Sequence, residues 1–219
     1  MRHSLESVIE ADDRKCETES FDILRLSAAD QYKLMGGLVF PRPIGLVSTL
    51  GPGGPNAAPF SFFNVAAVDP PILMFSIGPK ADTNKDTLTN IRHCPEFVVH
   101  LVSDVIKHKM NICAVEHPAN VNEMELAKFA TSPSLKVRPP RIVEAPVQFE
   151  CRLLQITELG NIPYHLVIGE IVHMHLHKGL VNERYYVDAG KLDLIGRIGG
   201  AGVYVKTDRT FVMPLPTRP

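Results

Sequence analysis

Residues 44–64 read I-G-L-V-S-T-L-G-P-G-G-P-N-A-A-P-F-S-F-F-N, and this stretch says most about how the chain folds. The apolar run Ile44–Leu50 predicts a β-strand, and residues 51–55 follow it with a dense glycine and proline turn signal. The chain then returns over Asn56–Phe63 as the predicted partner strand. Pro59 interrupts that strand and places it at a sheet edge or a bulge, because proline has no N–H for a sheet hydrogen bond.

The rest of the chain contributes more strands than helices. Further strands are predicted at Ile72–Ile77, Phe97–Val102, 147–153 and 165–177, and helices at Leu26–Met35, Leu88–Ile91, 103–115 and 122–129. The helices cluster between strands instead of alternating with them, and no G-x-G-x-x-G follows a strand. The pattern therefore predicts a mainly β fold, an antiparallel barrel with short helical insertions, and argues against a parallel, doubly wound sheet.

In two of these strands the residue pattern predicts which side chains face the core. Over 147–153 apolar residues alternate with Gln148, Glu150 and Arg152, which is typical of a strand with one buried face. In 165–177 the apolar residues at even positions predict the core side. Three histidines then project from the other face, toward solvent or a partner subunit: His173, His175 and His177. Such a row can bind Zn²⁺ or Ni²⁺, but we expect no native metal site there.

Composition limits the classes of function. The 219 residues suffice for one substantial domain, and a net charge of −1 gives no basic field to attract nucleic acid or anionic lipid. We expect no membrane helix and a cytoplasmic protein, because the start is charged and lacks a signal-peptide core. The four cysteines form no C-x-x-C pair, and Cys94 and Cys151 are interpreted as small buried hydrophobes. Any redox chemistry must then come from a cofactor.

Two stretches are candidates for ligand binding. Asn56–Asn64 offers small residues against which a flat ligand can lie, with Ser61 and Asn64 for its polar edge; the alternative is a plain edge strand. Residues 80–87 open a helix whose N-terminal amides favour a phosphate; the alternative is simple helix capping, with Asp82 or Thr83 as the cap. Together the stretches describe two ends of one ligand, a ring system and a phosphate. His108 and His117 are interpreted as exposed polar residues.

Several segments, in order and with matching spacing, resemble the flavin-reductase-like family with the FMN-binding split barrel. The resemblance covers about residues 35–205 and is strongest toward flavoredoxin-like proteins and the reductase components of two-component monooxygenases. The segments that carry it are R-P-I-G-L-V-S-T (42–49), N-A-A-P-F-S-F-F-N (56–64), P-P-I-L-M-F-S-I (70–77), K-D-T-L-T-N-I (85–91), E-F-V-V-H-L-V (96–102), P-P-R-I-V-E-A-P-V-Q-F-E-C (139–151), H-L-V-I-G-E-I-V (165–172) and R-I-G-G-A-G-V-Y (197–204).

The resemblance implies a homodimeric split β-barrel of the Greek-key type that holds FMN noncovalently near the dimer interface. We expect a leader at 1–20, the flavin domain at 21–205 and a tail at 206–219, with the leader and the tail outside the resemblance. Arg42 and Arg197 are further candidate contacts. The residues that the resemblance assigns to the flavin ring are Ser48, Thr49, Ala58, Pro59, Ser61, Phe62, Asn64 and His165, and those assigned to its phosphate end are Thr83, Lys85, Asp86 and Thr87.

The function implied by the resemblance is an NAD(P)H-dependent flavin reductase that passes reduced flavin to a monooxygenase, or electrons to another acceptor. We assign no catalytic residue, because a flavin accepts hydride directly and the protein supplies orientation and electrostatics. Two alternatives stay open: a flavoredoxin-like electron carrier without a direct nicotinamide reaction, and a non-enzymatic protein that binds flavin, deazaflavin or heme. Similarity of fold does not choose among them.

Overall fold

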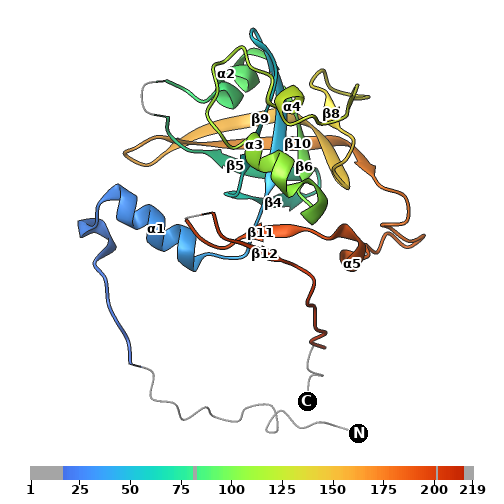
Figure 1. Ribbon diagram of the computed structural model, residues 1–219. Coiled ribbons are helices and arrows are strands. Elements are labelled where there is room, and N and C mark those ends of the chain that lie inside the picture. The colour runs from blue at the N-terminus through green and yellow to red at the C-terminus, as the bar shows by residue number, and fades with distance from the viewer. Residues whose placement is uncertain (1–16, 81–82, 201, 215–219) are drawn as a thin grey trace, which may run out of the picture.

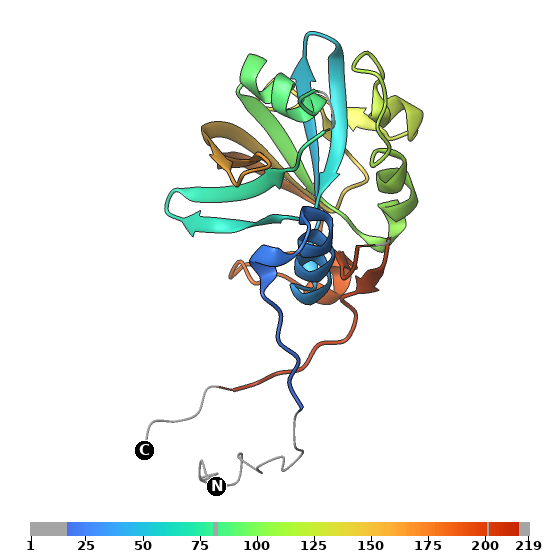
Figure 2. The same ribbon diagram turned by 90° about the vertical axis from the view of Figure 1, so that its left-hand side faces the viewer.

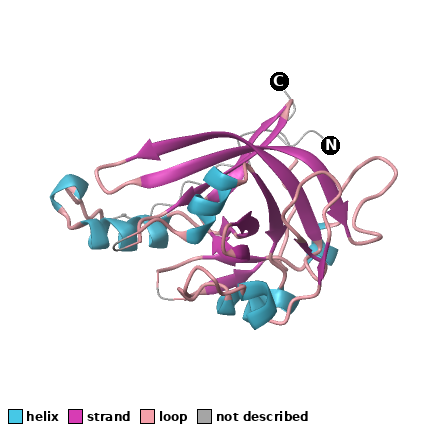
Figure 3. Ribbon diagram, turned by 90° about the horizontal axis from the view of Figure 1, so that it is seen from above, coloured by secondary structure: helices cyan, strands magenta, loops and turns pink. Residues whose placement is uncertain are grey.

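The computed structural model describes residues 17–80, 83–200 and 202–214. Within these residues the chain folds around a seven-stranded sheet with the order β3-β2-β6-β9-β10-β5-β4, in which every neighbouring pair is antiparallel (Figure 1). Seen from above, the strands curve around the interior (Figure 3). The prediction of a mainly β, antiparallel fold is confirmed. The strands are β2 (Gly45–Gly51), β3 (Gly54–Phe60), β4 (Phe63–Val68), β5 (Pro71–Ile77), β6 (Glu96–Leu101), β9 (Val147–Leu159) and β10 (Tyr164–Leu176).

The hairpin of β2 and β3 forms where the sequence predicts it. The two strands pair from Gly45 opposite Phe60 to Gly51 opposite Gly54. Gly54 has a φ of +107°, a backbone conformation that glycine adopts without strain. β3 lies at the edge of the sheet, as Pro59 predicts. The strand ends at Phe60, earlier than expected, and β4 begins at Phe63.

A second, three-stranded sheet consists of β1 (Arg42–Pro43), β11 (Ile195–Arg197) and β12 (Tyr204–Lys206), in the order β1-β11-β12. It lies below the large sheet, beside α1 (Ala28–Leu38) and α5 (Ala189–Leu192), in the view of Figure 1. The described ends of the chain lead away from the body on this same side (Figures 1 and 2). No helix of the described residues has the length and apolar character needed to cross a membrane.

The helical insertion between β6 and β9 is more broken than predicted. The expected helix over 103–115 is a 3₁₀ turn, η3 (Asp104–Ile106), followed by α3 (Lys107–Ile112). Ser103 occupies the N-cap position of η3, but its side chain makes no capping hydrogen bond, and its backbone forms a bridge to Leu194. The expected helix over 122–129 is reduced to α4 (Glu123–Leu126), and Asn122 caps it by accepting from the Met124 N–H at 3.1 Å.

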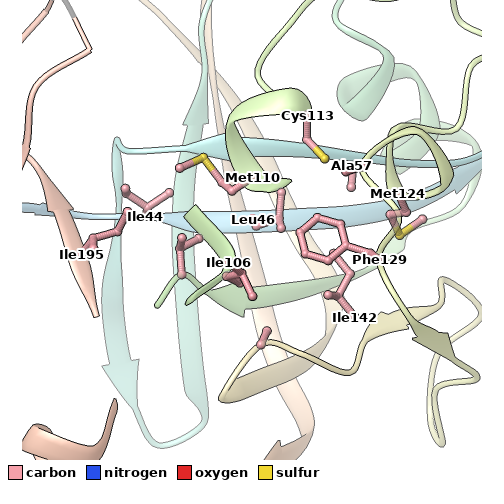
Figure 4. Close-up of a cluster of buried hydrophobic side chains, with 13 residues drawn as sticks. Ile44, Leu46, Ala57, Ile106, Met110, Cys113, Met124, Phe129, Ile142 and Ile195 are labelled. Atoms are coloured by element: carbon pink, nitrogen blue, oxygen red, sulfur yellow. The ribbon is translucent and has the colours of Figure 1, made fainter. Parts of the chain in front are cut away.

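Two hydrophobic clusters hold the elements together, one on each face of β2. Leu46 packs with side chains of the insertion, among them Met110 and Phe129, and Figure 4 shows the three in one cluster. The next residue, Val47, points the other way and packs with Phe75 inside the large sheet. Both faces of this strand are therefore buried, and each such side chain contributes about 1.5–3 kcal/mol to stability. The cysteines at 94, 113 and 151 are buried and free, so the interpretation of Cys94 and Cys151 is confirmed.

The alternation predicted for β9 is only partly correct. Gln148 and Glu150, expected on an exposed face, are 3% and 0% exposed. The segment after α4, which carries β7 (Thr131–Ser132) and β8 (Arg141–Ile142), covers them and binds them by hydrogen bonds. The residue pattern of a strand does not show that a loop from another part of the chain covers its polar face.

The prediction of the buried face of β10 is wrong. Val167, at an odd position, is fully buried, whereas Met174 and Leu176, expected in the core, are 48% and 37% exposed. His175 belongs to the more buried side, and its Nε2 lies 2.7 Å from the Glu150 Oε1. Two register shifts along β10 bend the strand, the first at Gly169, which leaves room for the Phe97 ring. Within the described parts of the chain, no three potential metal ligands cluster.

Candidate functional site

Three adjoining hollows lie along β3 and the residues that follow it, and Pro59 lines all of them. The charged hollow, of about 100 Å³, is bordered by Lys80, Lys85 and Glu123. The aromatic hollow, of about 320 Å³, is bordered by Tyr32, Phe62 and Tyr164. The third, here called the inner hollow, has a volume of about 170 Å³ and is lined by residues that include Ser61, Arg197 and Tyr204.

The charged hollow lies at the N-terminus of α2 (Asp86–His93). Lys85 is the N-cap residue, and its side chain makes no capping hydrogen bond; its Nζ is 3.7 Å from the Glu116 Oε1. The first amides of a helix have no intrahelical acceptor and carry the positive end of its dipole. Two lysines and this helix end therefore make the hollow suited to an anion. Thr83 is exposed and does not cap the helix, and Asp82 lies outside the described residues.

A buried hydrogen-bonded chain forms the back wall of the charged hollow. Glu123, from α4, accepts from the Asn56 Nδ2 at 2.9 and 3.0 Å and from the Ala57 N–H at 3.3 Å. The Thr87 hydroxyl donates to the Asn56 Oδ1 at 3.5 Å. Burial raises the pKa of the Glu123 carboxyl above its ordinary value. These contacts tie α2, β3 and α4 together around the hollow.

His117 contributes the one orphaned polar atom of the site. It lies in the loop between α3 and α4 and is partly buried, which corrects the expectation of an exposed residue. Its Nε2 is buried and has no hydrogen-bond partner, and no other side-chain nitrogen or oxygen in the described part of the chain shares this condition. Buried polar groups in native proteins nearly always have partners, so a group from outside the chain, a ligand or an ordered water, would satisfy this atom.

The aromatic hollow contains a row of three rings. Phe62 is at its centre, 6.3 Å from the Tyr32 ring and 6.1 Å from the Tyr164 ring, with the last pair stacked at 23°. The Arg42 guanidinium lies 5.8 Å from the centre of the Phe62 ring. Aromatic rings at such spacings provide flat apolar surface for another planar ring system.

The residues present fit a flavin mononucleotide. A flat ring system needs apolar and aromatic contact, which the aromatic hollow offers, and a phosphomonoester needs cations and free donors, which the charged hollow offers. The two hollows share Pro59, Phe60 and Lys85, so one extended ligand can reach both.

Most, but not all, of the residues predicted for the site border these hollows. They include four residues of β3 and the turn after it and three of the four residues predicted for the phosphate end. The residues so placed are Ala58, Pro59, Ser61, Phe62, Lys85, Asp86 and Thr87, with Arg197 from the additional candidates.

The remaining predicted residues line none of the three hollows. Ser48 and Thr49 are fully buried: the Ser48 hydroxyl donates to the Pro140 oxygen at 2.6 Å, and the Thr49 Oγ1 accepts from the Asn90 Nδ2 at 3.0 Å. Their side chains are used to bind the segment before β8 and helix α2 to the sheet. The sequence alone does not show whether a small polar side chain in a strand forms its hydrogen bond with a ligand or with another part of the chain.

Asn64, Thr83 and His165 also line none of the three hollows. Asn64 is exposed, and its Oδ1 accepts from the Val65 N–H at 2.8 Å. His165 is 8% exposed and lies 3.6 Å from the Glu158 carboxylate. Its neighbour Tyr164 borders the aromatic hollow instead, because successive side chains of a strand point to opposite faces.

Among the residues that border the hollows and that sequence reasoning missed are Tyr32, Lys80, His117, Glu123 and Tyr164. Lys80 lay within a stretch already considered for phosphate binding and could have been included. Tyr32 and Tyr164 come from a helix and a strand far from β3 in sequence, and no local signal links them to it. Glu123 follows Asn122, the N-cap of α4, and its position is that of an ordinary first-turn acid.

Comparison with known proteins now identifies the class. Residues 35–193 match the model of the family described as "Flavin reductase like domain". The chain belongs to this flavin-reductase-like family of flavoproteins, whose members are oxidoreductases. The resemblance seen in the sequence is confirmed.

Solved structures and curated relatives agree with that membership. Nitrilotriacetate monooxygenase component B from Bacillus cereus superposes with a TM-score of 0.86 at 32% identity, covering 90% of this chain and 100% of its own. For 2-nitrobenzoate 2-nitroreductase from Pseudomonas fluorescens the TM-score is 0.82 at 33% identity, with 91% and 97% covered. An uncharacterized protein of Aquifex aeolicus is 44% identical over 177 residues, 80% of this chain and 89% of that protein.

Proposed function

We propose that this chain binds FMN noncovalently and transfers electrons from NADH or NADPH to flavin, supplying reduced flavin or electrons to a partner protein. The observation that carries the proposal is the adjacency of the charged and aromatic hollows across Pro59. It offers separate surroundings for the phosphate and the ring system of one ligand. The likeness to a protein named as a monooxygenase component supports a monooxygenase as the partner.

Each side of the site has a distinct task in this proposal. A bound flavin would supply the hydride acceptor, so the chain needs no acid or base of its own for that step. Lys80 and Lys85 hold the phosphate, with the first amides of α2, including that of Thr87, as hydrogen-bond donors. Phe62 and Tyr164 support the ring and exclude water from one side of it.

We also propose that the working form is a homodimer. Large apolar side chains are exposed on β4, at the last residue of α1 and just after that helix: Val65 by 58%, Val68 by 84%, Leu38 by 71% and Phe40 by 58%. A second copy of the chain would remove this surface from water. Sedimentation equilibrium should give twice the mass of the chain, and a monomer with full FMN occupancy would contradict the proposal.

The decisive experiment follows absorbance at 340 nm after the purified protein is mixed with NADH or NADPH and FMN under air. A flavin reductase should consume the nicotinamide at a rate proportional to protein concentration, and only with flavin present. Omitting the protein or the flavin supplies the controls. Tight FMN binding without nicotinamide consumption would favour an electron carrier of the flavoredoxin kind, and absence of flavin binding would remove the whole proposal.

A further inference from the structure

His117 occupies a position in the charged hollow that the proposed roles of the lysines do not explain. The hollow has one wall from α2 and β3 and another from the insertion, where Cys113, Ala114 and His117 line it. The buried, unpartnered Nε2 of His117 belongs to this second wall. A buried imidazole nitrogen without a partner either lowers the stability of the protein or forms its hydrogen bond with a group from outside the chain.

The charges around His117 come from every element that borders the hollow. Positive charge comes from the end of β5 and the start of α2, and negative charge from α2, the His117 loop and α4. The charged and titratable groups that line the hollow with His117 are Lys80, Lys85, Asp86, Cys113, Glu116 and Glu123. Burial raises the pKa of the Cys113 thiol to about 12, so it contributes no charge near neutral pH.

This balance leaves too little positive charge for a phosphate dianion. A phosphomonoester carries about −1.5 to −2 charges near neutral pH. One of the two lysines, Lys85, already faces Glu116 at 3.7 Å, and the Glu123 carboxylate lies in the back wall. A further cation, set on the side of the hollow opposite α2, would offset these acids when the anion enters.

We infer, on the basis of the FMN site proposed above, that His117 is a third cationic ligand of the flavin phosphate, and that its protonation sets how strongly the protein prefers FMN over riboflavin. A protonated imidazole has a positive charge and an N–H on each ring nitrogen. Its Nε2–H would donate to a phosphate oxygen, and protonation would add a positive charge to that bond. Riboflavin lacks the phosphate, so its binding is independent of His117.

The test measures dissociation constants of FMN and riboflavin by flavin fluorescence, at pH 6.0 and 8.5, for the wild type and three variants. His117→Asn removes the cation, and His117→Lys keeps a positive charge at both pH values. His108→Asn is the matched control, because His108 lines a different cavity together with Lys107. The phosphate of free FMN also titrates near pH 6, and this contribution is the same in the titrations of all variants.

At pH 6.0 we expect His117→Asn to weaken FMN binding about tenfold, the effect of one charge-assisted hydrogen bond, and at pH 8.5 less than twofold. His117→Lys should hold the wild-type affinity at pH 6.0 and exceed it at pH 8.5. Riboflavin affinity should stay constant in all three variants, as should FMN affinity in His108→Asn. Melting temperatures of the variants show that each one folds.

Other outcomes overturn the inference. Equal weakening of FMN by His117→Asn at both pH values would make the contact a neutral or packing one, and no weakening would remove His117 from the site. A wild-type protein that binds FMN and riboflavin equally well would instead refute the phosphate end of the proposed function. A protein that binds neither would refute the flavin site altogether. Failure of the inference about His117 and failure of the proposed function therefore give different results in this test.

Discussion

Two clusters of buried and partly buried polar side chains contain the same kinds of residue. The interior cluster consists of His100, Gln148, Glu150 and His175, and the hollow cluster of Asn56, Thr87, His117 and Glu123. Each combines a buried glutamate with at least one histidine. They differ in whether their hydrogen bonds are all satisfied within the chain.

In the interior cluster every histidine nitrogen that is buried has a partner. The His100 Nδ1 lies 2.8 Å from the Leu46 oxygen, and its Nε2 accepts from the Ile142 N–H at 2.8 Å. Glu150 accepts from the Leu135 and Lys136 N–H groups at 2.8 and 2.6 Å. These bonds attach the segment around β8 to the sheet, so the cluster is structural.

In the hollow cluster, the His117 Nε2 has no partner and Glu123 borders open space. The pKa shifts of the two glutamates follow the same difference. Burial raises the pKa of Glu150, but the hydrogen bonds from His175 and two amides outweigh it and leave this pKa below its ordinary value. For Glu123 burial prevails and the pKa is raised. A buried polar cluster whose hydrogen bonds are all formed within the chain indicates a structural role. A cluster with an unpaired polar atom beside a cavity indicates a binding site.

The largest expected effect comes from breaking the interior cluster. Glu150→Ala removes a fully buried carboxylate and leaves two backbone amides and His175 without their acceptor, so the free energy of unfolding should fall by about 3 kcal/mol. For a chain of this size the melting temperature should fall by about 10 °C. The ratio of FMN to riboflavin affinity should not change. Glu158→Ala, on the same strand with a side chain that is 67% exposed, is the matched control. A changed ratio would contradict the division between the clusters.

The pH dependence of stability should come from the interior cluster. Burial lowers the pKa of His100 to about 4, from its ordinary value near 6.5. Between these values the unfolded chain binds a proton that the folded chain does not, so stability should fall as pH decreases from about 6.5 to 4, by about 3 kcal/mol at most. Urea unfolding at pH 7.0 and 4.5 checks this, with His100→Gln as the comparison. Equal pH slopes in both proteins would exclude His100 as the cause.

The same comparison shows what the sequence could predict. Local patterns predicted the β2–β3 hairpin, the edge position of Pro59 and the cation at Lys85 before α2, because neighbouring residues determine them. They did not predict the burial of Glu150, because residues about 15 positions away cover it. The partners of Ser48 and the absence of a partner at His117 likewise depend on distant segments.

The next effect concerns the charged hollow. Lys85→Ala should raise the FMN dissociation constant about tenfold and leave that of riboflavin unchanged, since one charge-assisted hydrogen bond to phosphate is lost. Lys33→Ala is the control, because the Lys33 side chain is 73% exposed and pairs only with Asp30 along α1. Fluorescence quenching titrations of both flavins measure the ratio. If Lys85→Ala lowers the melting temperature but not the ratio, Lys85 serves the helix and the phosphate lies elsewhere.

The smallest effect should come from the ring side of the site and should be the same for both flavins. Phe62→Leu keeps an apolar side chain but removes the ring between Tyr32 and Tyr164, and an aromatic pair is worth about 0.5–1.5 kcal/mol beyond its buried area. FMN and riboflavin should therefore both bind about two- to tenfold more weakly, by equal factors. Phe211→Leu, in the tail with 81% of the residue exposed, is the matched control and should change neither. Because the two ligands differ only in the phosphate, equal factors place Phe62 beside the ring system. A larger loss for FMN than for riboflavin would mean that the aromatic hollow also senses the phosphate, and the assignment of one hollow to each end of the flavin would then be wrong.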